Sequence, residues 1–157
     1  MKIATAGKGG SGKTTIAGTL SRILARKKGK ILAIDGDPNP NLAFALGITR
    51  EASDAIPSIP SSIMHVVEDS AGDKHLELSI SREELISSYA AGAPDGIELI
   101  VMGKPDHGSA GSGCMCASHR AVRGLISEMT DYGEHTITDL DAGLEHLKRG
   151  TARNVDV

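Results

Sequence analysis

A run of glycine, lysine and threonine near the N-terminus carries the clearest chemistry in the sequence. Residues 7–14 read Gly-Lys-Gly-Gly-Ser-Gly-Lys-Thr and match the pattern G-x-x-x-x-G-K-[ST] throughout. In this pattern, glycines let successive backbone N–H groups surround phosphate oxygens, the lysine reaches the phosphates, and the final hydroxyl binds Mg²⁺. The bland alternative is a glycine-rich turn that only packs closely. We predict a mononucleotide site in which Lys13 contacts phosphate and Thr14 binds Mg²⁺.

The two cysteines, Cys114 and Cys116, are separated by one residue and follow a glycine-rich stretch. A position just before a helix lowers the pKa of a thiol, so both thiolates become available to a soft or borderline metal. Two thiolates make half of a tetrahedral site, and a copy of the loop across a twofold axis would supply the other half. A redox pair and two incidental cysteines are the alternatives, although a disulfide at this spacing is strained.

The pattern of apolar residues predicts the elements that position these groups. We predict strands at Lys2–Ala6, Ile31–Ile34, Ile97–Met102 and His135–Asp139, and helices at Lys13–Lys28, at Asn41–Leu46 and after Ser118. The first helix carries Ile16, Leu20, Ile23 and Leu24 on one stripe, and the last has an inner face of Ala121, Val122, Leu125, Ile126 and Met129. Alternating strands and helices predict an α/β fold, doubly wound, with a mostly parallel sheet and helices on both faces. Residues 1–157 would form one domain.

Other segments are less regular. We predict loops at Glu51–Ser62 and Gly103–Gly113, a helical segment after Ile63, an edge strand at His75–Leu78 and a helix near Glu83–Ser88. Asp37 lies at the carboxyl end of the second predicted strand and Asp139 at the end of the fourth, and ligands gather at strand ends in such sheets. Asp35 either belongs with them or only shapes an Asp-Gly turn.

Composition excludes several classes of protein. The 157 residues carry a net charge of −3, and basic residues cluster only at Arg26-Lys27-Lys28, so we expect no nucleic-acid partner. No apolar run reaches the roughly 20 residues that span a bilayer, and the first residues lack the apolar core of a signal peptide. These features predict a cytoplasmic protein without a membrane partner.

The second lysine of the loop, Lys8, belongs to a pattern that is typical of one class of ATPases. The loop resembles the deviant P-loop class, K-G-G-x-G-K-[ST]-[ST], of nitrogenase iron protein and the ParA/MinD ATPases. The resemblance implies that Lys8 contacts nucleotide phosphate across a homodimer interface and acts with Lys13 in catalysis. It also implies that Asp37 orients the attacking water, that Asp139 holds Mg²⁺ through its water shell, and that the N–H of Gly143 senses the γ-phosphate. The nucleotide-binding residues would then be Gly7, Lys8, Gly9, Gly10, Ser11, Gly12, Lys13, Thr14, Thr15, Asp139 and Gly143.

Gly-Ser-Gly-Cys-Met-Cys at residues 111–116 and the run from Asp139 to Arg149 resemble the carbon monoxide dehydrogenase accessory ATPases of the CooC type. That family implies a homodimeric ATPase that binds Ni²⁺ (or Zn²⁺) through Cys114 and Cys116. It would deliver nickel to carbon monoxide dehydrogenase or acetyl-CoA synthase. The resembled proteins continue beyond this region with strands that recognise adenine, so we expect those parts to be absent here. The resemblance therefore implies that residues 1–157 form one domain of a P-loop NTPase fold, incomplete at the C-terminus.

Two other functions remain open at this stage. One is a nickel-binding module that does not hydrolyse ATP, and the other is a different ParA/MinD-type ATPase. An iron–sulfur reductase needs a second, well-separated cysteine, and none follows Cys116.

Overall fold

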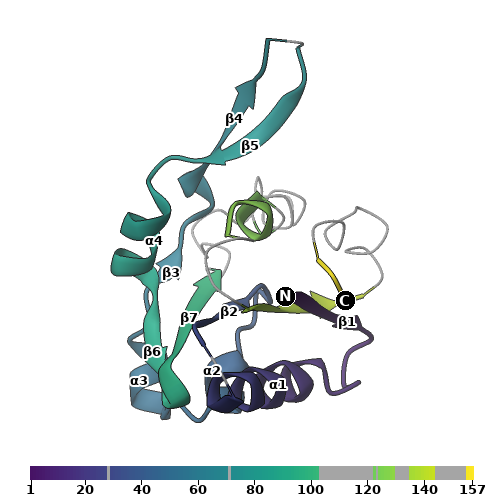
Figure 1. Cartoon of the computed structure of the whole chain (residues 1–157), viewed down its shortest axis with the longest axis vertical. Coiled ribbons are helices and arrows are strands. Elements are labelled where there is room, and N and C mark those ends of the chain that lie inside the picture. The colour runs from purple at the N-terminus through teal and green to yellow at the C-terminus, as the bar shows by residue number, and fades with distance from the viewer. Residues whose placement is uncertain (28, 71, 103–121, 123, 130–134, 144–154) are drawn as a thin grey trace.

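A six-stranded sheet forms the centre of the molecule in the computed structural model, which describes residues 1–27, 29–70, 72–102, 122, 124–129, 135–143 and 155–157. Across the sheet the strands run in the order β1 (Lys2–Gly7), β8 (His135–Ala142), β2 (Ile31–Asp35), β7 (Ile97–Met102) and β3 (Ser58–Ile59) (Figure 1). These five strands pair in parallel, whereas β6 (Ala91–Ala93) pairs antiparallel with β7. The predicted mostly parallel α/β sheet is therefore confirmed.

Helices cover both faces of this sheet, as the doubly wound prediction requires. Helices α1 (Lys13–Lys27) and α2 (Leu42–Leu46) lie below it in Figure 1, and the helical segment at residues 124–129 lies above it. Strand residues alternate between the two faces: Ile31 and Ala33 join the lower core, while Leu32 and Ile34 join the upper one. A strand with both faces buried is mostly apolar, as β2 is from Ile31 to Ile34.

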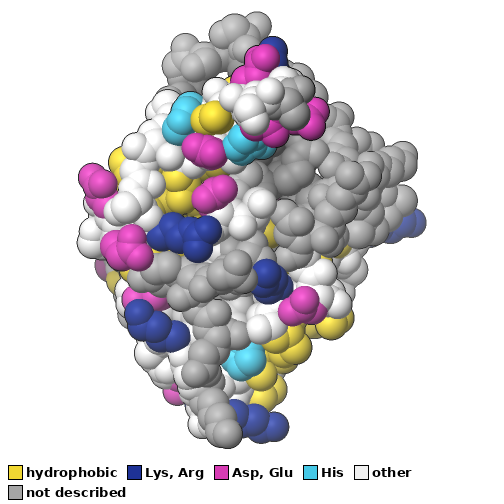
Figure 2. Space-filling model, turned by 45° about the horizontal axis from the view of Figure 1, so that its top comes forward, with side chains coloured by type: hydrophobic (Ala, Val, Ile, Leu, Met, Phe, Trp, Pro, Cys, Tyr) yellow, Lys and Arg dark blue, Asp and Glu magenta, His cyan; other side chains and the backbone are white. Residues whose placement is uncertain are grey.

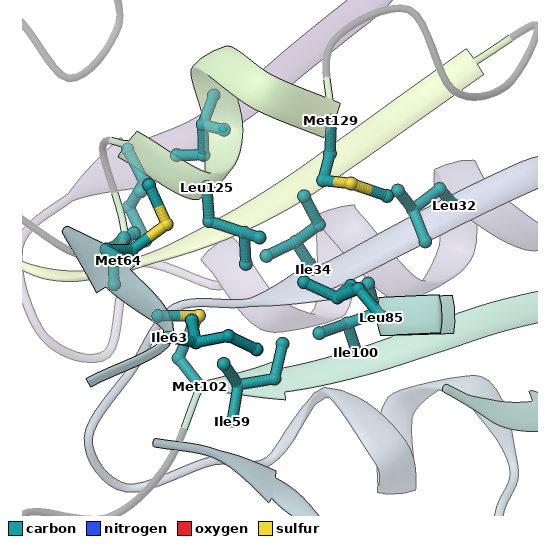
Figure 3. Packing of buried hydrophobic residues seen from close by; sticks show 13 residues of the cluster. Leu32, Ile34, Ile59, Ile63, Met64, Leu85, Ile100, Met102, Leu125 and Met129 are labelled. Carbon is teal, nitrogen blue, oxygen red and sulfur yellow. The ribbon is translucent and has the colours of Figure 1, made fainter. Parts of the chain in front are cut away.

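The upper core is aliphatic, with methionine filling its gaps. In Figure 3, Leu125 and Met129 from residues 124–129 point toward Ile34 and Leu32 of β2. The predicted inner face of this helix is confirmed at its described positions, because Val122, Leu125, Ile126 and Met129 are all buried.

The stripe predicted for α1 is only half correct. Leu20 and Leu24 pack against the lower core, but Ile16 and Ile23 are exposed. The buried positions are instead the small residues Ala17, Gly18 and Ser21. Small residues face inward because α2 crosses close to α1: a Cβ on Gly18 would lie 2.6 Å from the Cβ of Ala45. Side-chain size thus decided which face of the helix packs, against the apolar stripe.

The segment between α2 and α4 differs most from its prediction. The predicted loop at residues 51–62 contains α3 (Arg50–Asp54), β3 and the start of the 3₁₀ turn η1 (Ser61–Ile63). The predicted helical segment after Ile63 is wrong, since β4 (Met64–Glu68) pairs antiparallel with β5 (Lys74–Leu78). The expected strand near 75–78 exists but belongs to this separate hairpin, which projects from the body in Figure 1.

The remaining elements follow their local signals. The predicted helix near residues 83–88 is α4 (Arg82–Tyr89), whose N-cap Ser81 accepts a hydrogen bond from the N–H of Glu84. A second 3₁₀ turn, η2 (Pro94–Gly96), leads into β7. Lys28, the predicted loop at 103–113 and the predicted helix start at Ser118 lie outside the described residues.

Candidate functional site

The phosphate-loop motif connects the end of β1 to the start of α1, as the motif requires. Gly10 and Gly12 have φ angles of +75° and +84°, in the left-handed region that side chains with a Cβ rarely adopt. The N–H groups of Gly12, Lys13 and Thr14 find no acceptor anywhere in the described part of the chain. Unpaired N–H groups at a helix N-terminus attract anions, so the loop has the donors that a phosphate group needs.

Two lysines flank these donors. The Nζ of Lys13 donates to the backbone carbonyl of Lys8 at 3.3 Å, which folds the Lys13 side chain back over the loop. The N–H of Ser11 donates to the same carbonyl at 3.3 Å. Lys8 and Thr15 are exposed, and no acidic residue lies in the first turn of α1 to neutralise the positive end of the helix.

Asp139 lies at the base of the loop, on the neighbouring strand β8. The register places it opposite Thr5 of β1 and Asp35 of β2. Its Oδ2 accepts a hydrogen bond from the Thr14 hydroxyl at 2.5 Å, and its Oδ1 accepts one from the Thr5 hydroxyl at 2.9 Å. Because Thr14 donates its proton to Asp139, the lone pairs of that hydroxyl stay available to a cation. The donor set of hydroxyl and carboxylate oxygens fits Mg²⁺.

Burial and several neighbouring groups shift the pKa of Asp139. Burial raises the pKa, and the hydrogen bonds from Thr14 and Thr5 lower it. The positive charge of Lys13 also lowers it, whereas the negative charge of Asp37 raises it. Lys13 and Asp37 therefore lie close enough to Asp139 for their charges to shift its pKa.

Asp37 lies in the turn that follows β2. It is half-buried, and its Oδ1 accepts a hydrogen bond from the N–H of Asn39 at 2.8 Å. The preceding residue, Gly36, donates its N–H to the backbone carbonyl of Asp139 at 2.9 Å, so this turn is bonded directly to β8. The structure brings Asp37 to the same edge of the sheet as the phosphate loop.

Gly143 follows the end of β8 and meets the phosphate loop through its backbone. Its N–H donates to the carbonyl of Gly7 at 3.0 Å, in an isolated antiparallel bridge. The glycine expected to respond to the γ-phosphate thus contacts the first residue of the loop that would hold it.

Asp35 is the residue whose importance the sequence did not decide. It is completely buried at the end of β2, and burial raises its pKa to about 7. Two backbone hydrogen bonds, from Leu42 and Asp37, oppose this rise, while the charges of Asp139 and Asp37 add to it. Its position at the end of an otherwise apolar strand was the available signal, because a carboxylate there must be either buried or at a site.

The predicted thiolate metal site cannot be compared with the structure, because Cys114 and Cys116 lie outside the described residues. Among the residues that are described, no group of three or more His, Cys, Asp or Glu side chains could hold a metal ion. Over the same residues, no helix is both long and apolar enough to cross a membrane.

Comparison with known proteins places this geometry in a family. Residues 2–154 match the CobQ/CobB/MinD/ParA nucleotide binding domain. The whole chain aligns with the carbon monoxide dehydrogenase accessory protein CooC of Rhodospirillum rubrum, at 37% identity and over 60% of the length of CooC. The chain thus spans about 60% of the length of the curated relatives it matches.

Solved structures agree on the fold. The chain is similar to a ParA family ATPase from Chlorobium tepidum TLS, with a TM-score of 0.66 and 17% identity over 99% of this chain and 57% of the other. It is also similar to the septum site-determining protein MinD of Pyrococcus horikoshii OT3 complexed with Mg-ADP, with a TM-score of 0.63 and 21% identity over 99% and 56% of the two chains. The resemblances predicted from the sequence are confirmed. With its phosphate loop between β1 and α1 and a match over nearly its whole length, the chain belongs to the CobQ/CobB/MinD/ParA nucleotide-binding domain family.

Proposed function

We propose that this chain binds Mg·ATP at the loop of residues 7–14 and hydrolyses the bond between the β- and γ-phosphates. One observation carries the proposal: the Thr14 hydroxyl donates to the buried carboxylate of Asp139, directly beside a helix N-terminus with unpaired N–H groups. Hydroxyl, carboxylate, lysine and free amides at one sheet edge are the groups that a magnesium-bound triphosphate requires.

Each residue then has a separate task. The loop amides and Lys13 hold the β- and γ-phosphates, and Lys13 balances charge that develops on the phosphate oxygens during transfer. Thr14 offers a hydroxyl oxygen to Mg²⁺, and Asp139 keeps that hydroxyl oriented while holding the water shell of the ion. Bound Mg²⁺ would neutralise charge on the triphosphate.

Asp37 orients the attacking water. The support for this role is that Asp37 follows β2 at the same sheet edge as the phosphate loop, and that its negative charge raises the pKa of Asp139. The exposed Lys8 is free to reach the phosphates of a second copy of the chain, so we propose a homodimer that closes when ATP is bound. Thr15 and the N–H of Gly143 complete the nucleotide contacts.

We further propose that ATP binding is coupled to Ni²⁺ (or Zn²⁺) held between the Cys114 and Cys116 pairs of two copies. The metal would be delivered, in the cytoplasm, to carbon monoxide dehydrogenase or acetyl-CoA synthase. Support comes from the Cys-x-Cys motif and from the 37% identity with a carbon monoxide dehydrogenase accessory protein.

Two measurements test this function. ATP turnover by the purified chain should require Mg²⁺ and should fall at least tenfold in Asp37→Ala, whereas Asp54→Ala on the exposed face of α3 should match the unmodified protein. Turnover that is independent of Asp37 would contradict the hydrolytic mechanism and leave a nickel-binding module that does not hydrolyse ATP.

The metal site is tested separately by nickel titration with and without nucleotide. The expected result is one Ni²⁺ per two chains, with thiolate-to-nickel absorption that is lost in Cys114→Ser. Nickel binding that survives this substitution, or binding by single chains, would contradict the shared thiolate site.

A further inference from the structure

The carboxylate of Asp35 joins the two ends of the segment that carries Asp37. Its Oδ1 accepts a hydrogen bond from the N–H of Asp37 at 3.2 Å, and its Oδ2 accepts one from the N–H of Leu42 at 2.8 Å. Leu42 is the first residue of α2, where a helix N–H has no partner within the helix. One buried side chain therefore closes the turn after β2 and also caps the helix that follows.

The segment has few other restraints on its outer side. On that side, Asn39, Pro40 and Asn41 line a cavity of about 400 Å³. The bonds of Asn39 and Asn41 are short-range: the N–H of Asn39 donates to Asp37, and the side-chain amide of Asn41 donates to the Asn39 carbonyl at 2.7 Å. The Asn41 carbonyl accepts from the N–H of Ala45, one turn into α2, at 3.4 Å. The position of Asp37 thus depends on bonds from beneath, from Asp35 and from the Gly36 bond to β8.

A turn alone does not need such a residue. A carboxylate that is completely buried loses its hydration, and two backbone N–H groups repay only part of that cost. The pKa near 7 is a consequence of this unfavourable environment. An asparagine or serine could close an ordinary turn without burying a charge. The buried carboxylate of Asp35 accepts hydrogen bonds from the N–H groups at the two ends of one segment, Asp37 and Leu42. Its unfavourable burial is understandable if the fold requires a fixed position for the Asp37 side chain on that segment.

We propose that Asp35 is a positioning residue for hydrolysis: by binding the N–H groups of Asp37 and Leu42, it sets the distance between the Asp37 carboxylate and the phosphate loop. This proposal rests on the proposed function, in which Asp37 orients the attacking water. Asp35 itself has no contact with the loop of residues 7–14 among the described hydrogen bonds, so it acts on turnover and leaves nucleotide binding intact.

The test is Asp35→Asn, which keeps the size of the side chain but turns one acceptor oxygen into a donor. That donor faces a backbone N–H, so at least one of the two bonds is lost. We expect the affinity for Mg·ATP to stay within about threefold of the unmodified protein, because Lys13, Thr14 and the loop amides are untouched. We expect kcat to fall at least tenfold. Asp73→Asn, an exposed carboxylate in the β4–β5 hairpin, is the matched control and should change neither quantity.

Amide hydrogen exchange provides a readout that does not depend on catalysis. In the unmodified chain, the amide of Leu42 should exchange at least tenfold more slowly than that of Asn41, which has no acceptor among the described residues. This comparison needs no variant, so it holds even if Asp35→Asn fails to fold. In a folded Asp35→Asn, the protection of Leu42 or Asp37 should be lost.

Three results would overturn the proposal. These are an unprotected Leu42 amide in the unmodified chain, an unchanged kcat in Asp35→Asn, and a parallel loss of ATP affinity and turnover that marks a general structural role. Absence of ATP hydrolysis by the unmodified protein contradicts the proposed function instead, and the exchange measurement then still decides whether Asp35 holds the segment.

Discussion

The carboxyl edge of the central sheet and the β4–β5 hairpin are both rich in charged side chains, but they hold these charges differently. At the sheet edge, Asp35 and Asp139 are almost inaccessible to water, and both oxygens of each accept hydrogen bonds. On the hairpin, the Lys74–Glu68 pair is 3.6 Å apart, and both side chains are more than half exposed. Figure 2 shows acidic and histidine side chains crowded at the top of the molecule.

This difference in burial determines how much each charge affects the stability of the fold. Water solvates the hairpin charges whatever their partners do, so each pair contributes little to stability. At the sheet edge the protein must replace water, and every lost partner leaves a buried group unsatisfied. Changes of equal chemistry should therefore have very unequal effects in the two regions.

The largest expected effect lies at the phosphate loop. Lys13→Ala should lower kcat/KM for ATP at least 100-fold, because the only lysine at the start of α1 would no longer meet the phosphates. Lys27→Ala, at the other end of the same helix, is the control and should have no effect. Retention of full activity by Lys13→Ala in a coupled ATPase assay would remove the phosphate loop from the mechanism.

The second effect is a dependence of stability on pH at Asp35. Its pKa is raised from 3.8 to about 7 in the folded chain, so the folded state keeps this proton over a pH range in which the unfolded state has lost it. The resulting stabilisation is fully present below pH 3.8 and is lost as the pH rises through 7. Between pH 5 and pH 8 the loss amounts to about 3 kcal/mol.

Asp35→Asn cannot lose this proton. The free energy of unfolding of the unmodified chain, minus that of the variant, should therefore fall by about 3 kcal/mol between pH 5 and pH 8. Urea unfolding of both proteins at the two pH values, followed by circular dichroism, measures this difference. An equal difference at both pH values would show that Asp35 titrates like an exposed carboxyl.

A third effect concerns the packing that supports the site. Gly18→Ala places a methyl group 2.6 Å from the Ala45 Cβ and 2.9 Å from the Ala45 backbone, so α1 and α2 must move apart. Overpacking of this kind costs about 1–3 kcal/mol, and the better helix propensity of alanine returns about 1 kcal/mol. Thermal unfolding should show a net destabilisation, while the exposed neighbour Thr19→Ala should be neutral or slightly stabilising. A stabilised Gly18→Ala would mean that the two helices are less closely packed.

The smallest effect belongs to the hairpin. Lys74→Ala removes one partner of an exposed ion pair and should change the free energy of unfolding by less than about 0.5 kcal/mol. A decrease of more than about 1 kcal/mol in the free energy of unfolding, measured with urea, would contradict the view that hairpin charges contribute little to stability.

Much of the site was predictable because its residues follow strong local patterns. The loop at 7–14 lies between an apolar strand and a helix, Asp37 follows the buried strand β2, and Asp139 lies near the carboxyl end of β8. Parallel strands have their carboxyl ends at the same edge of the sheet, so residues far apart in the chain lie close together there. The structure accordingly brings Lys13, Thr14, Asp37 and Asp139 together.

The segment from residue 51 to 80 was less predictable because its local signals compete. Proline and serine near residues 57–62 suggested a loop, although Thr49 caps a short helix and Ser58–Ile59 completes the edge of the sheet. The hairpin strand β4 reads Met-His-Val-Val-Glu, which is compatible with helix or strand until a partner is known. Pairing with β5 settled it, and pairing is a nonlocal interaction that no short window of sequence contains.

Glycine spacing, apolar strands and the order of motifs were enough to identify a phosphate loop, a parallel sheet and the candidate residues at its edge, because those features depend on backbone geometry and on neighbours along the chain. Which face of α1 packs, and what Asp35 binds, depended on the approach of α2 from across the fold. Burial and hydrogen-bond partners are set by distances between segments, and those distances exist only once the chain has folded.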